Sequence, residues 1–383
     1  MKTIVLTGGG SGGHITPLLA VAAELKKLQP DVRLVYIGQK GDSLGDVPAG
    51  HHLFDAAYTV RAGKFRRYHG EGLKQLLDLP TIAKNARDAV YVLIGIWQSW
   101  RLLRKLRPDV IFSRGGFVSV PVCLAGALRR RPYITHDSDS TPSLANRLIA
   151  RWARQHAVAM AAELYPYPPA KTRSVGVPVS REYKPVTTED QKKYKHEIGL
   201  ADAKQVVLIT GGGNGARQLN NVVLANAPRL LEHYPEMALI HVAGRALASG
   251  VATEYDKLLS KPDRQRIIVK DFLEDLYRYS GAADVVVGRG GASSLAEFAA
   301  QAKACVLVPS GQLIWNVKNS QVLAKEGAVV QLTEEQAEQE GRFAAVIGDL
   351  LDDPGRRAEL GRELAKLARP TAAHDLAELI LET

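Results

Sequence analysis

The sequence contains little cysteine and no long hydrophobic run, and each shortage excludes a class of protein. Its two cysteines, Cys123 and Cys305, lie far apart in apolar runs, so we expect two buried thiols rather than a disulfide or a metal site. The longest unbroken apolar run, residues 89–97, is much shorter than the roughly 18 to 20 residues that cross a bilayer. Because Met1 and Lys2 lead directly into an apolar run, we expect no signal peptide and a cytoplasmic location.

The sequence also lacks the acidic residue that would complete a dinucleotide site. Residues 7–17 read Thr-Gly-Gly-Gly-Ser-Gly-Gly-His-Ile-Thr-Pro and contain Gly-x-Gly-x-x-Gly between an apolar run and an amphipathic one. Such glycines let backbone N–H groups approach a phosphate at a helix N-terminus. The strand expected at 33–37, however, ends in Gly-Gln-Lys, where a dinucleotide-binding protein places an Asp or Glu.

A second glycine loop makes the two halves of the chain similar. Residues 211–216 read Gly-Gly-Gly-Asn-Gly-Ala after the apolar run 206–210, and the next expected strand, 239–243, again ends without an acid. Alternating apolar and helical segments in both halves predict parallel sheets with right-handed crossovers. We therefore expect an anion-binding cleft between two α/β domains rather than a nicotinamide site.

Charge and composition divide the chain into a basic and a mildly acidic half. Residues 1–176 carry 25 Lys and Arg against 12 Asp and Glu, whereas residues 177–383 carry 25 against 28. The basic half therefore faces an anionic lipid surface, a diphosphate or a nucleic acid. A proline-rich stretch at 166–185 predicts the linker. We expect one domain at 1–176 and another at 177–370, with a last helix, 371–383, as a candidate to pack back on the first.

An amphipathic segment in the basic half has the composition of an interfacial helix. Residues 89–106 present a broad apolar face, and basic residues lie before and after it. Tryptophan beside Lys and Arg favours contact with an anionic membrane surface, and we assign that contact to Trp97, Trp100, Arg66 and Arg67. A core helix with a solvated basic end explains the aliphatic positions of the segment equally well.

Two further segments follow expected strands of the first half. Residues 115–119, Gly-Gly-Phe-Val-Ser, form a third glycine turn after the run 109–112. His-Asp-Ser-Asp at 136–139 follows the run 132–135. Its two aspartates can hold a metal ion or cap the helix that follows, and the residues alone leave both roles open.

These motifs, taken in order, resemble those of the MurG family of membrane-associated N-acetylglucosamine transferases. Residues 8–17 are similar to the family's Gly-Gly-Thr-Gly-Gly-His with its proline, and residues 115–119 to Gly-Gly-Tyr-Val-Ser. His-Asp-Ser-Asp at 136–139 takes the place of His-Glu-Gln-Asn, and residues 211–217 are similar to Gly-Gly-Ser-Gln-Gly-Ala-Arg. Residues 289–297 resemble Arg-Ser-Gly-Ala followed by Ser-Glu, so the resemblance spans nearly the whole chain.

The resemblance implies a fold, a reaction and a set of partners. The fold is GT-B, an α/β architecture of two Rossmann-like domains whose parallel sheets face a cleft. The reaction is inverting transfer of N-acetylglucosamine from UDP-N-acetylglucosamine to undecaprenyl-diphosphate-linked muramoyl peptide, lipid I to lipid II, in peptidoglycan synthesis. The implied partners are this UDP-sugar, the lipid acceptor and the anionic cytoplasmic face of the membrane. No cofactor, no metal and no nucleic acid is implied.

The resemblance also implies which residues bind each substrate. The acceptor residues are Ser11, Gly12, Gly13, Gly115, Gly116, His136 and Asp139. The donor residues are Gly213, Asn214, Gly215, Arg181, Leu273, Arg289, Glu297, Trp315 and Asn316. The Glu297 carboxylate would hold the ribose hydroxyls and the Leu273 backbone would read the uracil. A first-turn acid such as Glu297 also complements a helix dipole.

His14 is the candidate general base. Inverting transfer needs a base that takes the proton of the acceptor hydroxyl, and an imidazole titrates near the working pH. A histidine that follows a glycine loop can instead donate a hydrogen bond to a phosphate. Asp137 is the competing base.

Several positions depart from the family pattern. Trp315 and Asn316 stand where the family has Gln-Gln, Asp139 replaces Asn, and Gly213 replaces Ser. Because altered polar contacts change substrate discrimination strongly, the alternative is a GT-B transferase that uses another nucleotide sugar or lipid-linked acceptor. The basic half also suggests a noncatalytic relative that binds lipid or nucleic acid, although the presence of His14 and Glu297 argues against it.

Overall fold

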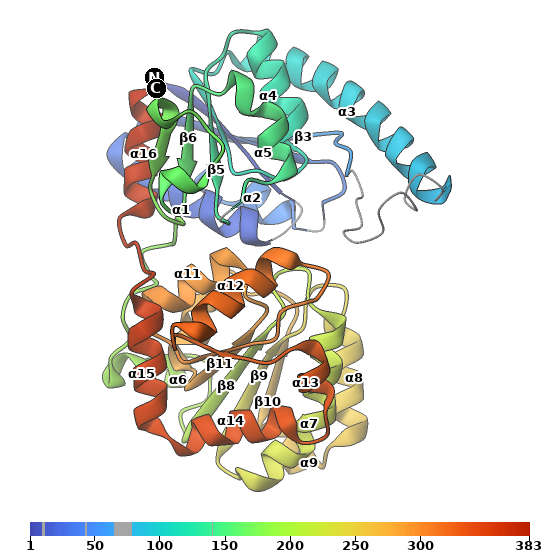
Figure 1. Cartoon of the computed structure of the whole chain (residues 1–383), viewed down its shortest axis with the longest axis vertical. Coiled ribbons are helices and arrows are strands. Elements are labelled where there is room, and N and C mark those ends of the chain that lie inside the picture. Colours follow the sequence, from blue (N-terminus) through green and yellow to red (C-terminus); the bar gives the residue numbers. More distant parts are fainter. Residues whose placement is uncertain (10–11, 43, 65–78, 140) are drawn as a thin grey trace. The chain divides into compact units, whose positions relative to one another are not determined.

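The computed structural model describes residues 1–9, 12–42, 44–64, 79–139 and 141–383, which form two compact units. The first unit comprises Met1–Ser180 and Thr371–Thr383, and the second comprises Arg181–Pro370 (Figure 1). Three residues assigned to sites from the sequence, Ser11, Arg66 and Arg67, lie outside the described residues.

Seven parallel strands form the sheet of the first unit, in the order β3-β2-β1-β4-β5-β6-β7. The strands are β1 Thr3–Thr7, β2 Arg33–Gln39, β3 Ala56–Val60, β4 Val110–Ser113, β5 Tyr133–Asp137, β6 Gln155–Val158 and β7 Thr172–Ser174. The connections after β1 and β4 run in opposite directions, so a topological switch point lies between the carboxyl ends of these two strands. The division between the two units, after Ser180, lies within the stretch 166–185 in which the sequence places the linker. The same stretch also contains β7, a strand too short to show an apolar alternation.

Helices cover both faces of this sheet and place apolar side chains against it. They are α1 Gly12–Leu28, α2 Asp46–Gly50, α3 Leu79–Leu106, α4 Ser119–Leu128, α5 Leu144–Ile149 and α16 Ala372–Glu382, with short 3₁₀ helices at Ala150–Trp152, Ala162–Leu164 and Pro169–Lys171. Among the described residues, no helix is both long enough and apolar enough to cross a membrane.

The last helix, α16, packs against α1 in the first unit. Its apolar face, with Leu376 and Ile380 fully buried, joins the core that contains Val21 and Leu25 of α1. The Lys2 ammonium donates a hydrogen bond to the Leu381 carbonyl oxygen at 2.5 Å. The two ends of the chain therefore complete one hydrophobic core.

The second unit repeats the strand order of the first. Six parallel strands run in the order β10-β9-β8-β11-β12-β13, so its switch point lies between β8 and β11. The strands are β8 Gln205–Thr210, β9 Met237–Val242, β10 Ile267–Lys270, β11 Val285–Gly288, β12 Cys305–Leu307 and β13 Val330–Gln331. The helices are α6 Thr188–Glu197, α7 Arg217–His233, α8 Ala248–Leu258, α9 Lys261–Gln265, α10 Leu276–Ala282, α11 Ala292–Ala300, α12 Ile314–Lys325, α13 Glu334–Glu338, α14 Arg342–Asp352 and α15 Pro354–Ala365.

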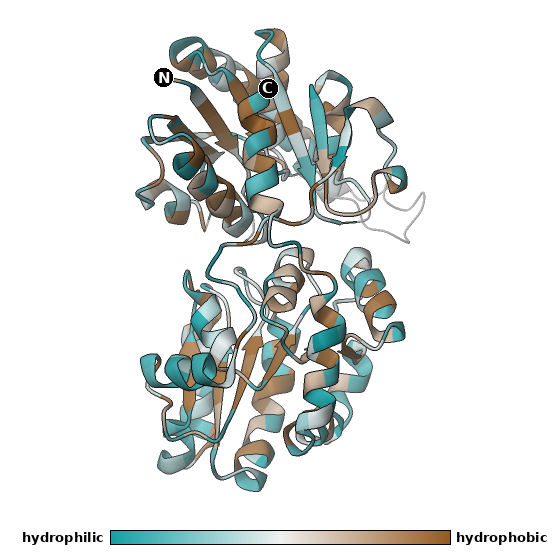
Figure 2. Cartoon of the chain, turned by 90° about the vertical axis from the view of Figure 1, so that its left-hand side faces the viewer, coloured by the Kyte–Doolittle hydropathy of each residue, from teal (hydrophilic) through white to brown (hydrophobic). Residues whose placement is uncertain are grey.

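Hydropathy explains why the strands occupy the middle of each unit. Central strands such as β1 and β8 are apolar and buried, whereas the helices alternate hydrophobic and hydrophilic residues (Figure 2). The prediction of parallel sheets between helices is confirmed. Cys123 and Cys305 are buried free thiols, as expected, and burial raises the pKa of each to about 12.

The packing of α16 can be tested with two leucine variants. We expect Leu376→Ala to lower the free energy of unfolding by about 2–5 kcal/mol, because a cavity adds to the lost apolar burial. The matched control is Leu128→Ala, at a side chain that is 70% exposed at the end of α4; it should cost less than about 0.5 kcal/mol. Urea unfolding followed by tryptophan fluorescence measures both changes. Equal losses would contradict a buried contact at α16.

Candidate functional site

Two glycine turns meet at the switch point of the first unit. The segment after β1 enters α1, which begins at Gly12, so Gly12, Gly13 and His14 lie in its first turn rather than in a loop. The first N–H groups of a helix have no partner within the helix, and they carry its partial positive charge. This turn can therefore hold an anion, as the sequence predicted.

The turn after β4 lies directly against the turn after β1. Gly115 and Gly116 have φ angles of +90° and +80°, which favour glycine. A Cβ atom at Gly116 would lie 2.8 Å from the Gly9 carbonyl oxygen and 3.5 Å from Cδ2 of His14. Glycine is required at residue 116 because its φ angle is positive and the Gly9 carbonyl oxygen occupies the space of a side chain; the His14 ring lies at ordinary contact distance.

The His14 ring is held as a neutral imidazole. Its Nδ1 lies 3.3 Å from the Arg114 carbonyl oxygen, which can only accept, so Nδ1 carries the proton and Nε2 carries the lone pair. Burial, followed by the positive charge of Arg114, lowers the pKa of His14 to about 4. At neutral pH the Nε2 atom is therefore ready to accept a proton.

Arg114 joins the two turns, and we did not identify it from the sequence. Its buried guanidinium donates from Nη2 to the Gly13 carbonyl oxygen at 3.2 Å and also to Ser138 Oγ. Pro17, four residues after Gly13 in α1, has no N–H to offer that carbonyl. Burial lowers the pKa of Arg114 only to about 10, so it stays charged. A proline inside the first helix was the sequence signal that an outside donor was needed.

Asp137 is occupied by three hydrogen-bond donors. Its Oδ1 accepts from the Ser143 backbone N–H at 3.1 Å and from Asn146 Nδ2 at 2.9 Å, and its Oδ2 accepts from the Tyr167 hydroxyl at 2.7 Å. Burial raises its pKa. These contacts fix the connection between β5 and α5, so the geometry favours His14 over Asp137 as the base. The side chain that caps α5 is Ser143, not an aspartate.

The other two residues of this segment have different surroundings. His136 is fully buried, and its Nε2 forms a hydrogen bond with the Gly176 carbonyl oxygen at 2.9 Å. Burial lowers its pKa to about 3. The ring therefore lies in the core of the unit, and the assignment of His136 to acceptor contact stays a prediction. Asp139 is partly exposed, and its charge acts on Arg114.

The second unit has its own glycine loop, between β8 and α7. Gly215 has a φ of +73°, and a Cβ atom there would lie 2.1 Å from the Ala243 carbonyl oxygen. Asn220 of α7 donates to the same carbonyl at 3.0 Å. The loop that contains Gly213 and Asn214 is therefore fixed against the end of β9, at the N-terminus of a 17-residue helix, where a diphosphate is favoured.

The turn after β11 lies beside α12. A Cβ atom at Gly290 would lie 3.2 Å from the Asn316 carbonyl oxygen, so Arg289 and the start of α12 are neighbours. Among the described residues, the buried Nε of Arg289 has no hydrogen-bond partner. Burial lowers the pKa of Arg289, an effect opposed by Glu334. A buried, unpaired donor favours an anionic ligand.

The remaining donor residues occupy the same unit. Glu297 lies buried on α11. The pKa of Tyr183 is raised by the burial of its own ring and by the negative charge of Glu297. Leu273 follows β10 and is partly buried in the core beside this strand. Trp315 is half-buried, with the Lys318 ammonium 5.5 Å from its ring centre, whereas Arg181 is exposed at the start of the unit. In a parallel sheet, the segments that directly follow the strands all lie at the same edge, where the carboxyl ends of the strands meet.

Comparison with known proteins assigns both units to one family. Residues 4–158 match the glycosyltransferase family 28 N-terminal domain, and residues 206–376 match the glycosyltransferase family 28 C-terminal domain. The UDP-N-acetylglucosamine--N-acetylmuramyl-(pentapeptide) pyrophosphoryl-undecaprenol N-acetylglucosamine transferase of Moorella thermoacetica is 32% identical, over 99% of this chain and 98% of its own. Transferase 2 of that name from Bacillus anthracis is 33% identical over 88% of both chains.

Solved structures are similar over the full chain. The crystal structure of Acinetobacter baumannii MurG is 20% identical, covers 100% of both chains and has a TM-score of 0.66. UDP-GlcNAc 2-epimerase from Neisseria meningitidis, bound to UDP-GlcNAc, is 15% identical with the same coverage and a TM-score of 0.66. These structures support the expected GT-B fold of two Rossmann-like domains. Together with the family matches, the relatives above 30% identity show that the chain belongs to glycosyltransferase family 28 and, within it, to the MurG family.

Proposed function

We propose that this chain transfers N-acetylglucosamine from UDP-N-acetylglucosamine to N-acetylmuramyl-(pentapeptide) pyrophosphoryl-undecaprenol, the reaction for which its relatives are named. The observation that carries the proposal is the neutral His14 at the first switch point, with its Nε2 free to accept a proton. The adjoining helix N-terminus can hold the pyrophosphate of the acceptor. Transfer of this sugar places the enzyme in peptidoglycan synthesis.

The reaction divides between the two units. In the first unit, His14 Nε2 takes the proton of the acceptor hydroxyl while its oxygen attacks the anomeric carbon in line. The bond from that carbon to the UDP oxygen breaks, and UDP leaves with the electron pair. In the second unit, the N–H groups around Gly213–Gly215 and the Arg289 guanidinium stabilise the charge on the leaving diphosphate. Glu297 holds the ribose.

A separate surface of the first unit supports contact with a membrane. Val90, Leu93, Trp97 and Trp100 follow helical spacing along one stripe of α3 and are all exposed. The guanidinium of Arg101 lies 4.9 Å from the Trp97 ring centre. Leu103, by contrast, is fully buried in the core. We propose that this exposed stripe docks on the anionic cytoplasmic face of the membrane, where the lipid acceptor lies.

Donor specificity and the role of His14 are tested in one assay. We expect UDP release with a soluble lipid-linked muramoyl-peptide analogue from UDP-N-acetylglucosamine, in preference to other UDP-sugars. His14→Ala should lower kcat/KM by about 10²- to 10⁴-fold, because the general base is lost. His52→Ala, at an exposed histidine, is the control. Turnover with another UDP-sugar alone would keep the mechanism and overturn the substrate, and an active His14→Ala would overturn the base.

The positive charge of Arg114 should affect the pH dependence of kcat/KM. Because His14 acts unprotonated, kcat/KM should be flat near neutrality and fall as the pH drops through its pKa of about 4. Arg114→Met removes a charge that lowers this pKa, so the acid limb should move upward toward 6.5, the ordinary value. Arg114→Lys keeps the charge and should hold the limb near its wild-type position. Equal shifts in both variants would show that the charge is not the cause.

Membrane contact is tested by vesicle sedimentation. Trp97→Ser combined with Trp100→Ser should lower binding to anionic phospholipid vesicles about tenfold or more, because two interfacial aromatic anchors are lost. Trp152→Ser is the matched control, since Trp152 is 52% exposed on a 3₁₀ helix of the same unit. Binding of the wild type should also weaken as salt increases. Equal binding by the double variant and the control would refute the assignment.

A further inference from the structure

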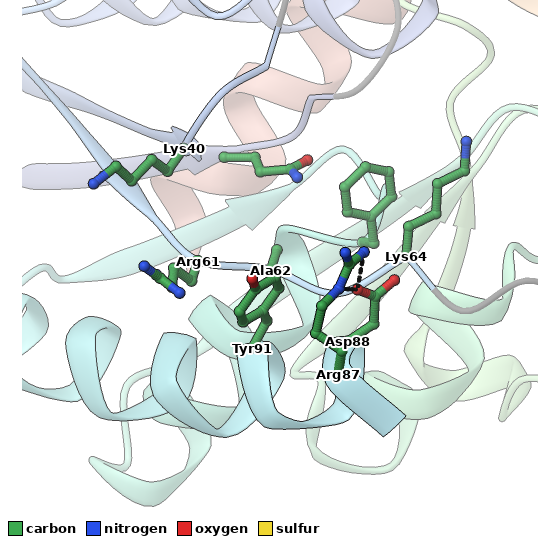
Figure 3. Close-up of a pocket in the computed structure, with 9 residues that line it drawn as sticks. Lys40, Arg61, Ala62, Lys64, Arg87, Asp88 and Tyr91 are labelled. Atoms are coloured by element: carbon green, nitrogen blue, oxygen red, sulfur yellow. Dashed lines mark hydrogen bonds and ion pairs between the residues drawn. The ribbon is translucent and has the colours of Figure 1, made fainter. Parts of the chain in front are cut away.

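The first unit contains a second polar cavity, at the carboxyl ends of β2 and β3. It has a volume of about 380 Å³ (Figure 3). We call it the basic pocket; its lining residues are Gln39, Lys40, Arg61, Ala62, Lys64, Arg87, Asp88, Tyr91 and Phe117. The sequence alone does not predict a site here, because these residues come from four separate segments.

Positive charge dominates the basic pocket. Of the lining residues that the structure describes, four are Lys or Arg and one is Asp, which gives these residues a formal charge of +3. Asp88 is buried and accepts from Arg87 Nη2 at 3.1 Å. The guanidiniums of Arg61 and Arg87 lie 5.0 Å and 5.5 Å from the centre of the same Tyr91 ring. Such crowded cations repel one another, and a bound anion would relieve that repulsion.

The backbone that carries these cations is fixed. The Arg61 N–H donates to Gln98 Oε1 of α3 at 2.8 Å, and the Lys40 N–H donates to the Val60 carbonyl oxygen at 2.9 Å. A Cβ atom at Gly95 would lie 2.0 Å from the Arg61 carbonyl oxygen, so α3 and the segment after β3 pack closely. The backbone of the pocket is therefore held in place by α3, whereas the four cationic side chains themselves are exposed.

The basic pocket adjoins the turn that supports His14. Phe117, one of its walls, directly follows Gly116. In the sheet order, β2 is next to β1 and β3 is one strand further, so the pocket lies about 5–10 Å along the sheet from the first glycine turn. An acceptor whose hydroxyl meets His14 can therefore reach the pocket with a group a few bonds away.

We infer that the basic pocket binds an oxyanion of the acceptor, and this inference rests on the proposed function. The acceptor offers two kinds of oxyanion, the carboxylate of its peptide and its pyrophosphate. Guanidinium groups bind either one through paired hydrogen bonds. The glycine turns and the α1 N-terminus already suit the pyrophosphate, so the peptide carboxylate is the expected occupant.

A lipid headgroup is a less suitable occupant. The exposed stripe that we propose docks on the membrane begins at Val90, three residues after Arg87 on α3, so distance does not separate it from the basic pocket. The basic pocket, however, is concave and has two aromatic walls, Tyr91 and Phe117, instead of an exposed apolar stripe. A defined ligand therefore fits it better than a flat lipid surface.

The test compares three acceptor analogues with the double variant Lys40→Gln/Arg61→Gln. One analogue carries the peptide, one carries a peptide whose carboxylates are amidated, and one has no peptide. We expect the double variant to raise KM for the first analogue about 10- to 100-fold with kcat nearly unchanged, because charge-assisted hydrogen bonds are lost. The KM values for the amidated and peptide-free analogues should change little. Arg173→Gln, at an exposed arginine on β7, is the matched control.

Each outcome has one meaning. An equal rise in KM for all three analogues would support an oxyanion site and identify the pyrophosphate as its occupant. Unchanged KM values, or a loss confined to binding of anionic vesicles, would overturn the inference. If the wild type releases no UDP, the proposed function fails instead, and calorimetry with the peptide-bearing analogue then tests the pocket directly: binding lost in Lys40→Gln/Arg61→Gln supports it, and binding retained in this variant overturns it.

Discussion

The first unit depends on one buried cation between two backbone turns. Without Arg114, the Gly13 carbonyl would lose a charged hydrogen-bond donor at the position where Pro17 can offer none. Burying a guanidinium costs free energy that hydrogen bonds offset, and the bonds from Nη2 of Arg114 to the Gly13 carbonyl oxygen and to Ser138 Oγ favour this arrangement of the turns. The same residue presents its carbonyl oxygen to His14. One side chain and its own backbone thus fix the anion-binding turn and the tautomer of the base.

Both units have the same strand order around their switch points. In each unit, the connections that follow the two central strands run in opposite directions. The segments that directly follow these strands are rich in glycine. The chemistry then differs. The first unit supplies a neutral imidazole and several cations, whereas the second supplies a glycine loop, the partly buried Arg289 and the buried Glu297. A base is useful beside the acceptor, and groups that stabilise negative charge are useful beside the leaving nucleotide.

The sequence predicted local features better than contacts across the chain. Glycines after apolar runs marked both loops, since strand, turn and helix there are encoded by neighbouring residues. Arg114 and His14 are 100 residues apart, and their contact requires β1 and β4 to be adjacent, which no local pattern reveals. The burial of His136 and its hydrogen bond with Gly176, 40 residues away, likewise could not be read from a local pattern. The remaining substrate contacts stay predictions.

The return of α16 to the first unit has a consequence for synthesis of the chain. The apolar surface of α1 that it covers, around Val21 and Leu25, is made early, whereas Leu376 and Ile380 are made only after the whole of the Arg181–Pro370 unit. The intervening Arg181–Pro370 unit can fold while that surface is still uncovered. The first unit therefore keeps this apolar surface uncovered, and open to aggregation, until residues beyond Pro370 have been made.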